Sequence, residues 1–511
     1  MDESSGHSEE QAQERRFEHL RQQAGLLLAP LIFGALWFLP IGSLSPGAHH
    51  LLAILGLVVT LWISEAVPLP ATALLGPVLC VVLGIGPARD VFRSFADPII
   101  LLFLGSFLLA EGMLHQGLNR RIAFQILGLP GVGGSPGRLL AAFGGITALI
   151  SMWVSNTATT AMMFPIGVAI LTEMARHESA RLGRTVAFTE LRFGTGLMLA
   201  AAFASSIGGM ATPVGSPPNL VGIGLIGKSL NVHISFFQWM AIGLPISLLL
   251  VSFLILYLHR VCPADRDALG DSTQWLQGEK AKLGPLRRGE RIVLLAFGTT
   301  VLLWLLPGVV GVMFGESAPV AQWLNQRFPE SIAALVGALL LFILPINFRT
   351  REFALTWTEA KRIDWGTILL FGGGLALGEL MFSTGLARWM GEGLALALQA
   401  RTTLGLVMLF GAVAIVLSET TSNTASATMV VPVAIAVAQA AGVDPLPPAL
   451  AACLAASMGF MLPVSTPPNA IVYGSGCVPL LTMARHGLVL DLVGFVVIVA
   501  VVTWLVPLVL K

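Results

Sequence analysis

Two copies of a short polar motif, Ser-Asn-Thr, interrupt apolar stretches of this 511-residue chain. The first copy is Ser155-Asn156-Thr157 and the second is Ser422-Asn423-Thr424. Hydroxyl and amide side chains favour helix N-termini, where free backbone N–H groups also attract anions. One isolated copy is typical of ordinary helix capping, but two symmetric copies predict a pair of hairpin tips that bind an anion.

A second motif, Pro-Pro-Asn, is also duplicated, within Ser216-Pro217-Pro218-Asn219 and Thr466-Pro467-Pro468-Asn469. Consecutive prolines remove two backbone donors, so the helices that contain them must break. Irregular backbone at membrane depth is tolerated where it lines a cavity, although a kink used only for packing is the alternative. Unwound backbone and nearby hydroxyls offer oxygen ligands for a small alkali cation; the candidates are Thr212, Gly215, Ser216, Ser465 and Thr466.

One further hydroxyl precedes each Ser-Asn-Thr motif. Ser151 and Ser418 stand four residues before Ser155 and Ser422 and share a helical face with them. They would complete a cation shell in both halves of the chain. The alternative is a helix serine that hydrogen-bonds its own backbone.

Charged residues are absent from the tips and the breaks, neither of which contains Lys or Arg. A dianion there would gain hydrogen bonds and helix dipoles, but two uncompensated charges in a low-dielectric site cost several kcal/mol. Bound cations would neutralise them, which predicts cation coupling. Glu111, Glu379 and Glu419 are the alternative, as proton carriers, or they only accept hydrogen bonds from backbone donors.

The composition places these motifs in a bilayer, because 55% of residues are hydrophobic and 11% are charged. The net charge of +1 gives no indication of nucleic-acid binding. We expect an all-α polytopic membrane protein with a cytoplasmic N-terminal segment at 1–23. Eleven apolar segments are long enough to span, at ~20 residues each: 24–42, 50–67, 70–87, 99–117, 195–227, 235–259, 290–310, 331–347, 365–385, 447–480 and 488–510. The stretches 138–174 and 402–440 carry the Ser-Asn-Thr motifs and are predicted to be re-entrant hairpins.

The two halves repeat in the same order. Ser-Asn-Thr recurs 267 positions later and Pro-Pro-Asn recurs 250 positions later. With a cytoplasmic N-terminus, 22 of the 29 Lys and Arg residues fall inside, as the positive-inside rule requires. The first hairpin then opens inward and the second outward, so the repeats are inverted, as in many secondary transporters. We expect a first repeat with scaffold helices at 24–259, a cytoplasmic linker at 260–289 and a second repeat at 290–511.

At these motifs the sequence resembles the divalent anion/sodium symporter (DASS) family. The resemblance rests on residues 418–427 and 459–474 and extends over nearly the whole chain from about residue 24. It implies eleven membrane helices with two hairpins, a homodimer and a transport domain that moves like an elevator. It places substrate carboxylates on Ser155, Asn156, Thr157, Ser422, Asn423, Thr424, Thr466 and Pro467. It places one Na⁺ by Ser151, Ser155, Asn156 and Gly215, and a second by Ser418, Thr421, Asn423 and Ser465.

The function predicted from the sequence is Na⁺-coupled uptake of small dicarboxylates such as succinate, malate or fumarate across a bacterial inner membrane, by a homodimer in contact with membrane lipid. A sodium-independent dicarboxylate exchanger and a carrier of sulfate or citrate are the alternatives within the family. An intramembrane enzyme would need a base beside its nucleophile, and His115 alone lies well inside a predicted span without a counterpart in the second half. A channel is disfavoured because inverted repeats with broken helices indicate alternating access.

Overall fold

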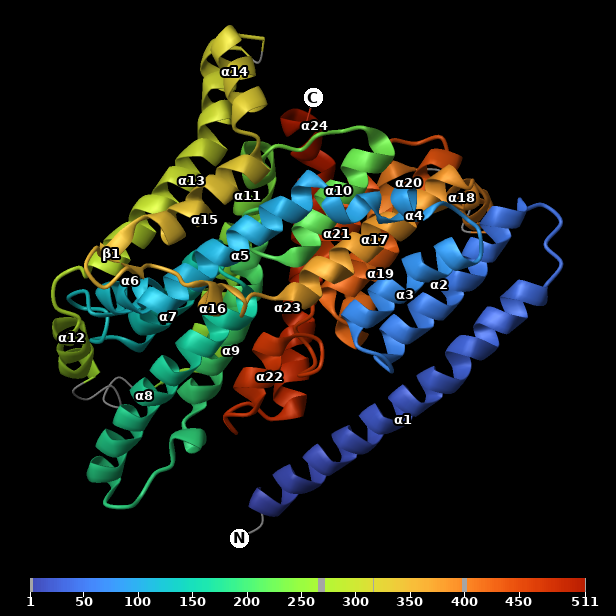
Figure 1. Ribbon diagram of the computed structural model, residues 1–511. Coiled ribbons are helices and arrows are strands. Elements are labelled where there is room, and N and C mark those ends of the chain that lie inside the picture. The colour runs from blue at the N-terminus through green and yellow to red at the C-terminus, as the bar shows by residue number, and fades with distance from the viewer. Residues whose placement is uncertain (1–2, 265–271, 316, 398–401, 511) are drawn as a thin grey trace.

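The protein folds almost entirely into helices, and the computed structural model describes residues 3–264, 272–315, 317–397 and 402–510. Figure 1 shows α1 along one side of the molecule, and α13 to α15 along the other. The first half and the linker contain α1 (Glu3–Phe38), α2 (Pro46–Ser64), α3 (Leu69–Val82), α4 (Ala88–Val91), η1 (Phe92–Ala96), α5 (Pro98–Gln116), α6 (Leu118–Leu127), α7 (Pro136–Ser151), α8 (Asn156–Leu182), η2 (Phe188–Glu190), α9 (Arg192–Gly209), α10 (Pro217–Leu230), α11 (Phe236–Val261) and α12 (Ser272–Lys282).

The second half is also helical, with one small addition that the all-α prediction omits: the antiparallel strands β1 and β2, which form a short hairpin. Its elements are α13 (Arg288–Phe314), α14 (Pro319–Arg327), α15 (Glu330–Ile343), β1 (Pro345–Asn347), β2 (Glu352–Phe353), α16 (Trp357–Ala360), α17 (Trp365–Ser383), α18 (Leu386–Ala397), α19 (Thr403–Thr420), α20 (Asn423–Ala440), α21 (Leu446–Ala455), α22 (Pro467–Tyr473), α23 (Leu480–Trp504) and α24 (Val506–Val509).

Several helices are long and apolar enough to cross a membrane. Within the described ranges nine meet this condition, or ten if α14 and α15, which are bent by 58° at their junction, form one span. The multi-pass helical prediction is confirmed, while the number of eleven spans stays a prediction. The cytoplasmic location of residues 1–23 stays a prediction. The structure adds that α1 begins at Glu3 and continues without interruption into the apolar run.

The helix breaks and the turns within the α7–α8 and α19–α20 pairs lie at the polar motifs, while the re-entrant course of both pairs stays a prediction. The chain leaves helical structure between α9 and α10, and again between α21 and α22, and each second helix begins at the first proline of its pair. Helices α7 and α8 are joined at residues 152–155, and α19 and α20 at residues 421–422. The prolines therefore start new helices, a position at which their missing N–H costs nothing.

Packing between the two halves brings these features together. Helix α10 of the first half packs against α20 of the second, and α22 of the second half packs against α8 of the first. Within each half, α7 packs against α9 and α19 packs against α21. Each broken helix thus contacts both its own hairpin and the hairpin of the other half, which places both tips and both breaks near one another.

Helix α9 lies at the centre of the core. Its residues from Phe193 to Gly209 are buried with the exception of Thr195, and a helix that is buried all round needs small or apolar residues on every face. Gly208 allows the closest approach, because a Cβ there would collide with the backbone of Ala148 in α7. This contact fixes the broken helix against its hairpin.

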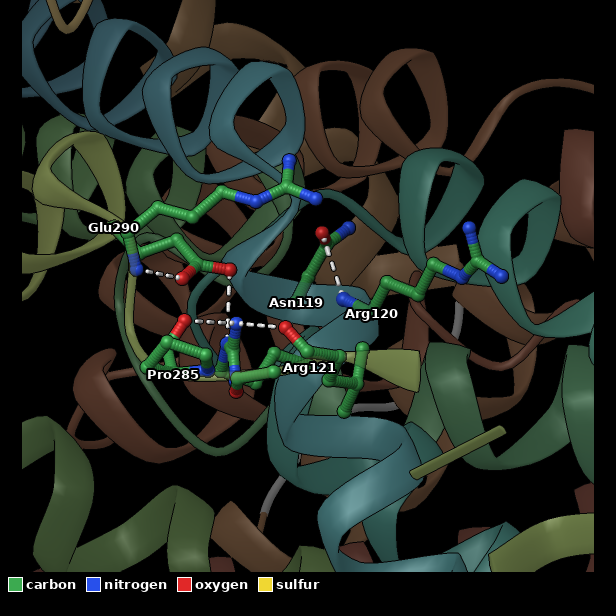
Figure 2. A network of polar contacts seen from close by, with 8 residues as sticks. Asn119, Arg120, Arg121, Pro285 and Glu290 are labelled. Atoms are coloured by element: carbon green, nitrogen blue, oxygen red, sulfur yellow. Dashed lines mark hydrogen bonds and ion pairs between the residues drawn. The ribbon is translucent and has the colours of Figure 1, made fainter. Parts of the chain in front are cut away.

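A buried polar network ties α6 to the start of the second half (Figure 2). Arg121 donates to the Glu290 carboxylate at 2.8 Å, and both side chains are 5% exposed. Its guanidinium also donates to the carbonyl oxygens of Leu283, Gly284 and Pro285. Because desolvation offsets much of the attraction in a buried ion pair, the main consequence is a fixed geometry between α6, the linker and α13.

The predicted orientation can be tested by labelling single cysteines. We expect an impermeant thiol reagent, applied to intact cells, to modify a cysteine at position 322 and to leave cysteines at positions 192 and 287 unmodified, because the basic residues segregate to the cytoplasmic side. The four native cysteines are buried and would be replaced first. Labelling at position 192 or 287 without labelling at position 322 would contradict the predicted topology and indicate the inverted one.

Candidate functional site

Both hairpin tips and both helix breaks line a single cavity of about 610 Å³. The cavity also reaches the start of α3, the middle of α5 and the start of α17. All eight residues predicted to contact substrate lie on its wall: Ser155, Asn156, Thr157, Ser422, Asn423, Thr424, Thr466 and Pro467. Their role in binding stays a prediction, but the fold gathers them from four separate segments.

Each tip serine is a helix N-cap. Ser155 Oγ accepts a hydrogen bond from the backbone N–H of Ala158 at 3.3 Å, and Ser422 Oγ accepts one from Ala425 at 3.2 Å. The capping interpretation therefore holds for both serines. Capping does not exclude anion binding, because one side chain satisfies only one of the N–H groups that a helix N-terminus leaves without intrahelical partners. Residues in the first turns of α8 and α20 also line the cavity.

An oxygen-rich cluster lies directly behind the first tip. One atom of the Asn156 side-chain amide is 2.8 Å from Ser151 Oγ, 3.0 Å from the Ser205 carbonyl oxygen and 3.3 Å from the Gly215 carbonyl oxygen. If that atom is the amide nitrogen, it donates to them. The nitrogen satisfies this environment, because an amide oxygen at the same point could accept only from Ser151 and would leave the two carbonyl oxygens facing an acceptor. A Cβ at Gly209 would collide with this amide, so glycine is required there.

The second tip repeats this arrangement. Ser418 Oγ lies 2.7 Å from Asn423 Oδ1 and 2.7 Å from the Ala456 carbonyl oxygen. A hydroxyl has one hydrogen, so it can satisfy only one of these acceptors. A Cβ at Gly459 would stand 3.2 Å from both Ser418 Oγ and Asn423 Oδ1. The two clusters thus share a serine, the tip asparagine and a glycine at corresponding positions: Ser151, Asn156 and Gly209 in the first, and Ser418, Asn423 and Gly459 in the second.

Not every predicted cation ligand points its hydroxyl at a cluster. Thr421 Oγ1 bonds back to the Leu417 carbonyl oxygen at 3.0 Å. Ser465 Oγ donates to the Glu419 carboxylate at 2.6 Å. A hydroxyl that donates its hydrogen keeps lone pairs that can coordinate a cation, so Thr421 and Ser465 stay predicted ligands. Ser151, Gly215 and Ser418 hold oxygens within the clusters themselves.

The asparagines of the Pro-Pro-Asn motifs hold the unwound segments in shape. Asn219 Nδ2 donates to the carbonyl oxygens of Gly209 and Thr212, both at 2.8 Å. In the second half Asn469 Nδ2 donates to the equivalent carbonyls of Gly459 and Leu462, both at 3.0 Å. The sequence marks both asparagines by their repetition, but it does not reveal that they act as clasps across each break.

The three candidate proton carriers have different environments. Glu379 pairs with Lys228 at 3.0 Å and accepts from Ser94. Glu419 accepts hydrogen bonds from the backbone N–H groups of residues 460, 461 and 462. Its carboxylate therefore satisfies unwound backbone between α21 and α22. Glu111 lines the cavity and is the candidate that faces the substrate-binding residues.

Two charged cavity residues were missed by sequence reasoning. Arg362 and Asp364 lie just before α17 and line the same cavity as the tips. They belong to no repeated motif, so the pattern that identifies the tips carries no signal for them. The tips and breaks contain no fixed positive charge, as predicted, but the wall around them does.

Comparisons with known proteins agree over nearly the whole chain. A family model described as the sodium:sulfate symporter transmembrane region matches residues 20–510. A sodium-dependent dicarboxylate transporter, SdcS, from Staphylococcus saprophyticus is 35% identical over 499 residues, which is 97% of this chain and 93% of the relative. SdcS from Staphylococcus aureus strain USA300 is 35% identical over 494 residues, 96% of this chain and 92% of that protein.

Two solved transporter structures share the fold at low sequence identity. The YdaH transporter of Alcanivorax borkumensis has a TM-score of 0.58 and 14% identity, with 96% of this chain and 98% of that chain covered. MtrF of Neisseria gonorrhoeae has a TM-score of 0.51 and 10% identity, with 84% of each chain covered. At these identities the likeness concerns the fold alone.

Proposed function

The chain belongs to the sodium:sulfate symporter family, in agreement with the resemblance of its motifs, and from that membership we propose that it couples the Na⁺ gradient to uptake of small dicarboxylates such as succinate, malate or fumarate. Its relatives are named sodium-dependent dicarboxylate transporters, which supports both the ion and the substrate class. The family and these relatives are transporters, so we assign the chain a transport role and no enzymatic one.

One observation carries this proposal: two tips and two breaks from opposite halves converge on a single cavity, with an oxygen cluster behind each tip. In the proposed mechanism the helix N-termini and the Ser-Asn-Thr side chains hold the substrate carboxylates. Na⁺ ions occupy the clusters behind them. Asn156 and Asn423 belong to both environments, since each lines the cavity and also takes part in a cluster.

Charge compensation gives a physical reason for coupling. At the tips and breaks a dianion meets helix dipoles and hydroxyls. The dipole of one helix is equivalent to only about half an elementary charge at its N-terminus. Two Na⁺ ions placed a few ångströms behind the tips would balance the substrate charge. Substrate and Na⁺ then stabilise each other, so each raises the affinity of the other by the same factor.

The substrate site in this proposal consists of Ser155, Asn156, Thr157, Ser422, Asn423, Thr424, Thr466 and Pro467. The first Na⁺ is assigned to Ser151, Ser155, Asn156 and Gly215, and the second to Ser418, Thr421, Asn423 and Ser465. We also propose the inverted repeats 24–259 and 290–511, joined by the linker 260–289, with hairpins at 138–174 and 402–440. A homodimer in a bacterial inner membrane, a cytoplasmic N-terminus and an elevator-like movement complete the proposal.

Uptake into proteoliposomes tests the proposed activity. We expect labelled succinate to accumulate under an inward Na⁺ gradient and to remain at background when choline replaces Na⁺ at constant ionic strength. Unlabelled malate and fumarate should compete, while sulfate and citrate should compete poorly. Uptake that requires internal dicarboxylate but no Na⁺ would establish the exchanger, and preferential sulfate or citrate transport would reassign the substrate.

A further inference from the structure

The wall of the cavity carries one fixed positive charge. Among the described residues that line it, Arg362 is the one Lys or Arg, and its side chain is exposed. Arg362 lies between α16 and α17, in the segment that passes beside α5 (Figure 1). A positive charge at this point changes the electrostatics of a cavity whose motifs contain none.

The backbone around Arg362 is held firmly. Its N–H donates to the Glu359 carbonyl oxygen at 2.9 Å, and the next residue, Ile363, is buried. Trp365 Nε1 donates to the Lys361 carbonyl oxygen at 3.2 Å. The position of the side chain on the wall is therefore set by the fold, and only its own torsions remain to be ordered by a ligand.

The neighbouring carboxylates are mostly engaged elsewhere. Asp364 caps α17 by accepting from the Thr367 N–H at 3.0 Å and from the Thr367 hydroxyl. Glu359 pairs with His115 at 2.8 Å and accepts from the N–H of Thr356. Glu111 remains, and it lines the same cavity as Arg362.

The guanidinium itself is not committed to an ion pair. Across the described part of the chain, no carboxylate oxygen lies within the 4.0 Å that defines an ion pair with Arg362. A guanidinium presents a planar fork of donors that matches a carboxylate in a bidentate pair. Arg362 thus lines the same cavity as the tip residues and carries donors that no ion pair occupies.

We propose that Arg362 is a substrate-binding residue, whose guanidinium pairs with one carboxylate of the dicarboxylate while the hairpin tips hold the other. This inference rests on the proposed function and deepens it, because it adds a charged contact from outside the repeated motifs. Glu111 lines the same cavity without an ion pair to Arg362, so the guanidinium is available to the substrate, and the Glu111 carboxylate opposes the binding of an anion. Arg362 then selects for dianions over monoanions, which lack a second carboxylate to meet it.

A structural role makes a different prediction. If Arg362 only neutralised Glu111, its loss would leave a bare carboxylate on the wall, which would repel the substrate and weaken binding indirectly. Removing both charges would then restore normal binding. If Arg362 contacts the substrate, removing both charges leaves binding weak, so a double-mutant cycle separates the two roles.

The test is equilibrium binding of labelled succinate to the purified full-length protein in Na⁺. We expect Arg362→Gln to raise the Kd about tenfold, Arg362→Lys to lie between this value and wild type, and Glu111→Gln to lower it. The double variant Glu111→Gln/Arg362→Gln should bind succinate clearly more weakly than the wild-type protein does. The matched control is Lys361→Gln, because Lys361 is the adjacent exposed cation and does not line the cavity, and it should bind as wild type does.

Three results would overturn the inference. An unchanged Kd for Arg362→Gln would show that Arg362 does not bind the substrate. A wild-type Kd in the double variant would show that Arg362 only neutralises Glu111. An equal rise of the Kd in Lys361→Gln would attribute the effect to the general surface charge. If Arg362→Gln does not fold, Arg362→Lys and Glu111→Gln still decide, since unchanged binding in both contradicts the proposal. Failure of the wild-type protein to bind succinate would instead refute the proposed function.

Discussion

Replacing either tip asparagine by alanine should abolish succinate uptake while leaving the protein folded. Asn156 and Asn423 each line the cavity and each contact the serine of an oxygen cluster, at 2.8 Å and 2.7 Å. Alanine removes the contact to the substrate and the link to the cation cluster together. Because an unmade polar contact to a charged group costs about 1.5–3 kcal/mol, losing both should bring uptake to background.

The measurement is succinate uptake by proteoliposomes that contain equal amounts of each purified variant. Asn325→Ala is the matched control, since Asn325 is exposed on α14 and does not line this cavity. Its uptake should equal that of the wild-type protein, and all three variants should elute alike on size exclusion. Normal uptake by either tip variant would exclude that tip from the site.

The motifs that could be predicted from the sequence are those that occur twice. Consecutive prolines force a break whatever the tertiary context, so the starts of α10 and α22 follow directly from Pro217 and Pro467. The Ser-Asn-Thr tips are recognisable because capping preferences act locally. Their duplication in the same order then places all four segments in corresponding parts of two repeats.

Features that depend on tertiary contacts could not be predicted from the sequence. Arg362 reaches the cavity only because the segment before α17 passes the tips, and no local pattern encodes that. The hydroxyl of Ser465 donates to Glu419, whose carboxylate also accepts from three backbone N–H groups of the broken helix. The sequence suggested Ser465 as a cation ligand and left the role of Glu419 open between proton transfer and backbone satisfaction.

Replacing the cluster serines should weaken Na⁺ binding more than it weakens the fold. We expect Ser151→Ala and Ser418→Ala each to raise the Na⁺ concentration for half-maximal succinate uptake about tenfold, the effect of losing about 1.4 kcal/mol of cation binding. Both serines are fully buried, and each contacts the amide of its tip asparagine. The measurement is the Na⁺ dependence of uptake at saturating succinate.

Ser106→Ala provides the matched control for both serine variants. Ser106 is also a buried helix serine, but it donates to the carbonyl oxygen of Leu102 in its own helix at 2.7 Å. If Ser151 and Ser418 had only this backbone-bonding role, all three variants would behave alike. An unchanged Na⁺ dependence in both cluster variants would remove these hydroxyls from the cation sites.

Succinate binding to the purified protein, measured in Na⁺ and again in choline at equal ionic strength, tests the central claim most directly. If the clusters behind the tips bind Na⁺ and so compensate the substrate charge, the Kd for succinate should rise steeply as Na⁺ is withdrawn, and by linkage succinate should lower the Kd for Na⁺ by the same factor. Equal succinate affinity in Na⁺ and in choline would contradict Na⁺ coupling and would favour exchange, or proton coupling through Glu111.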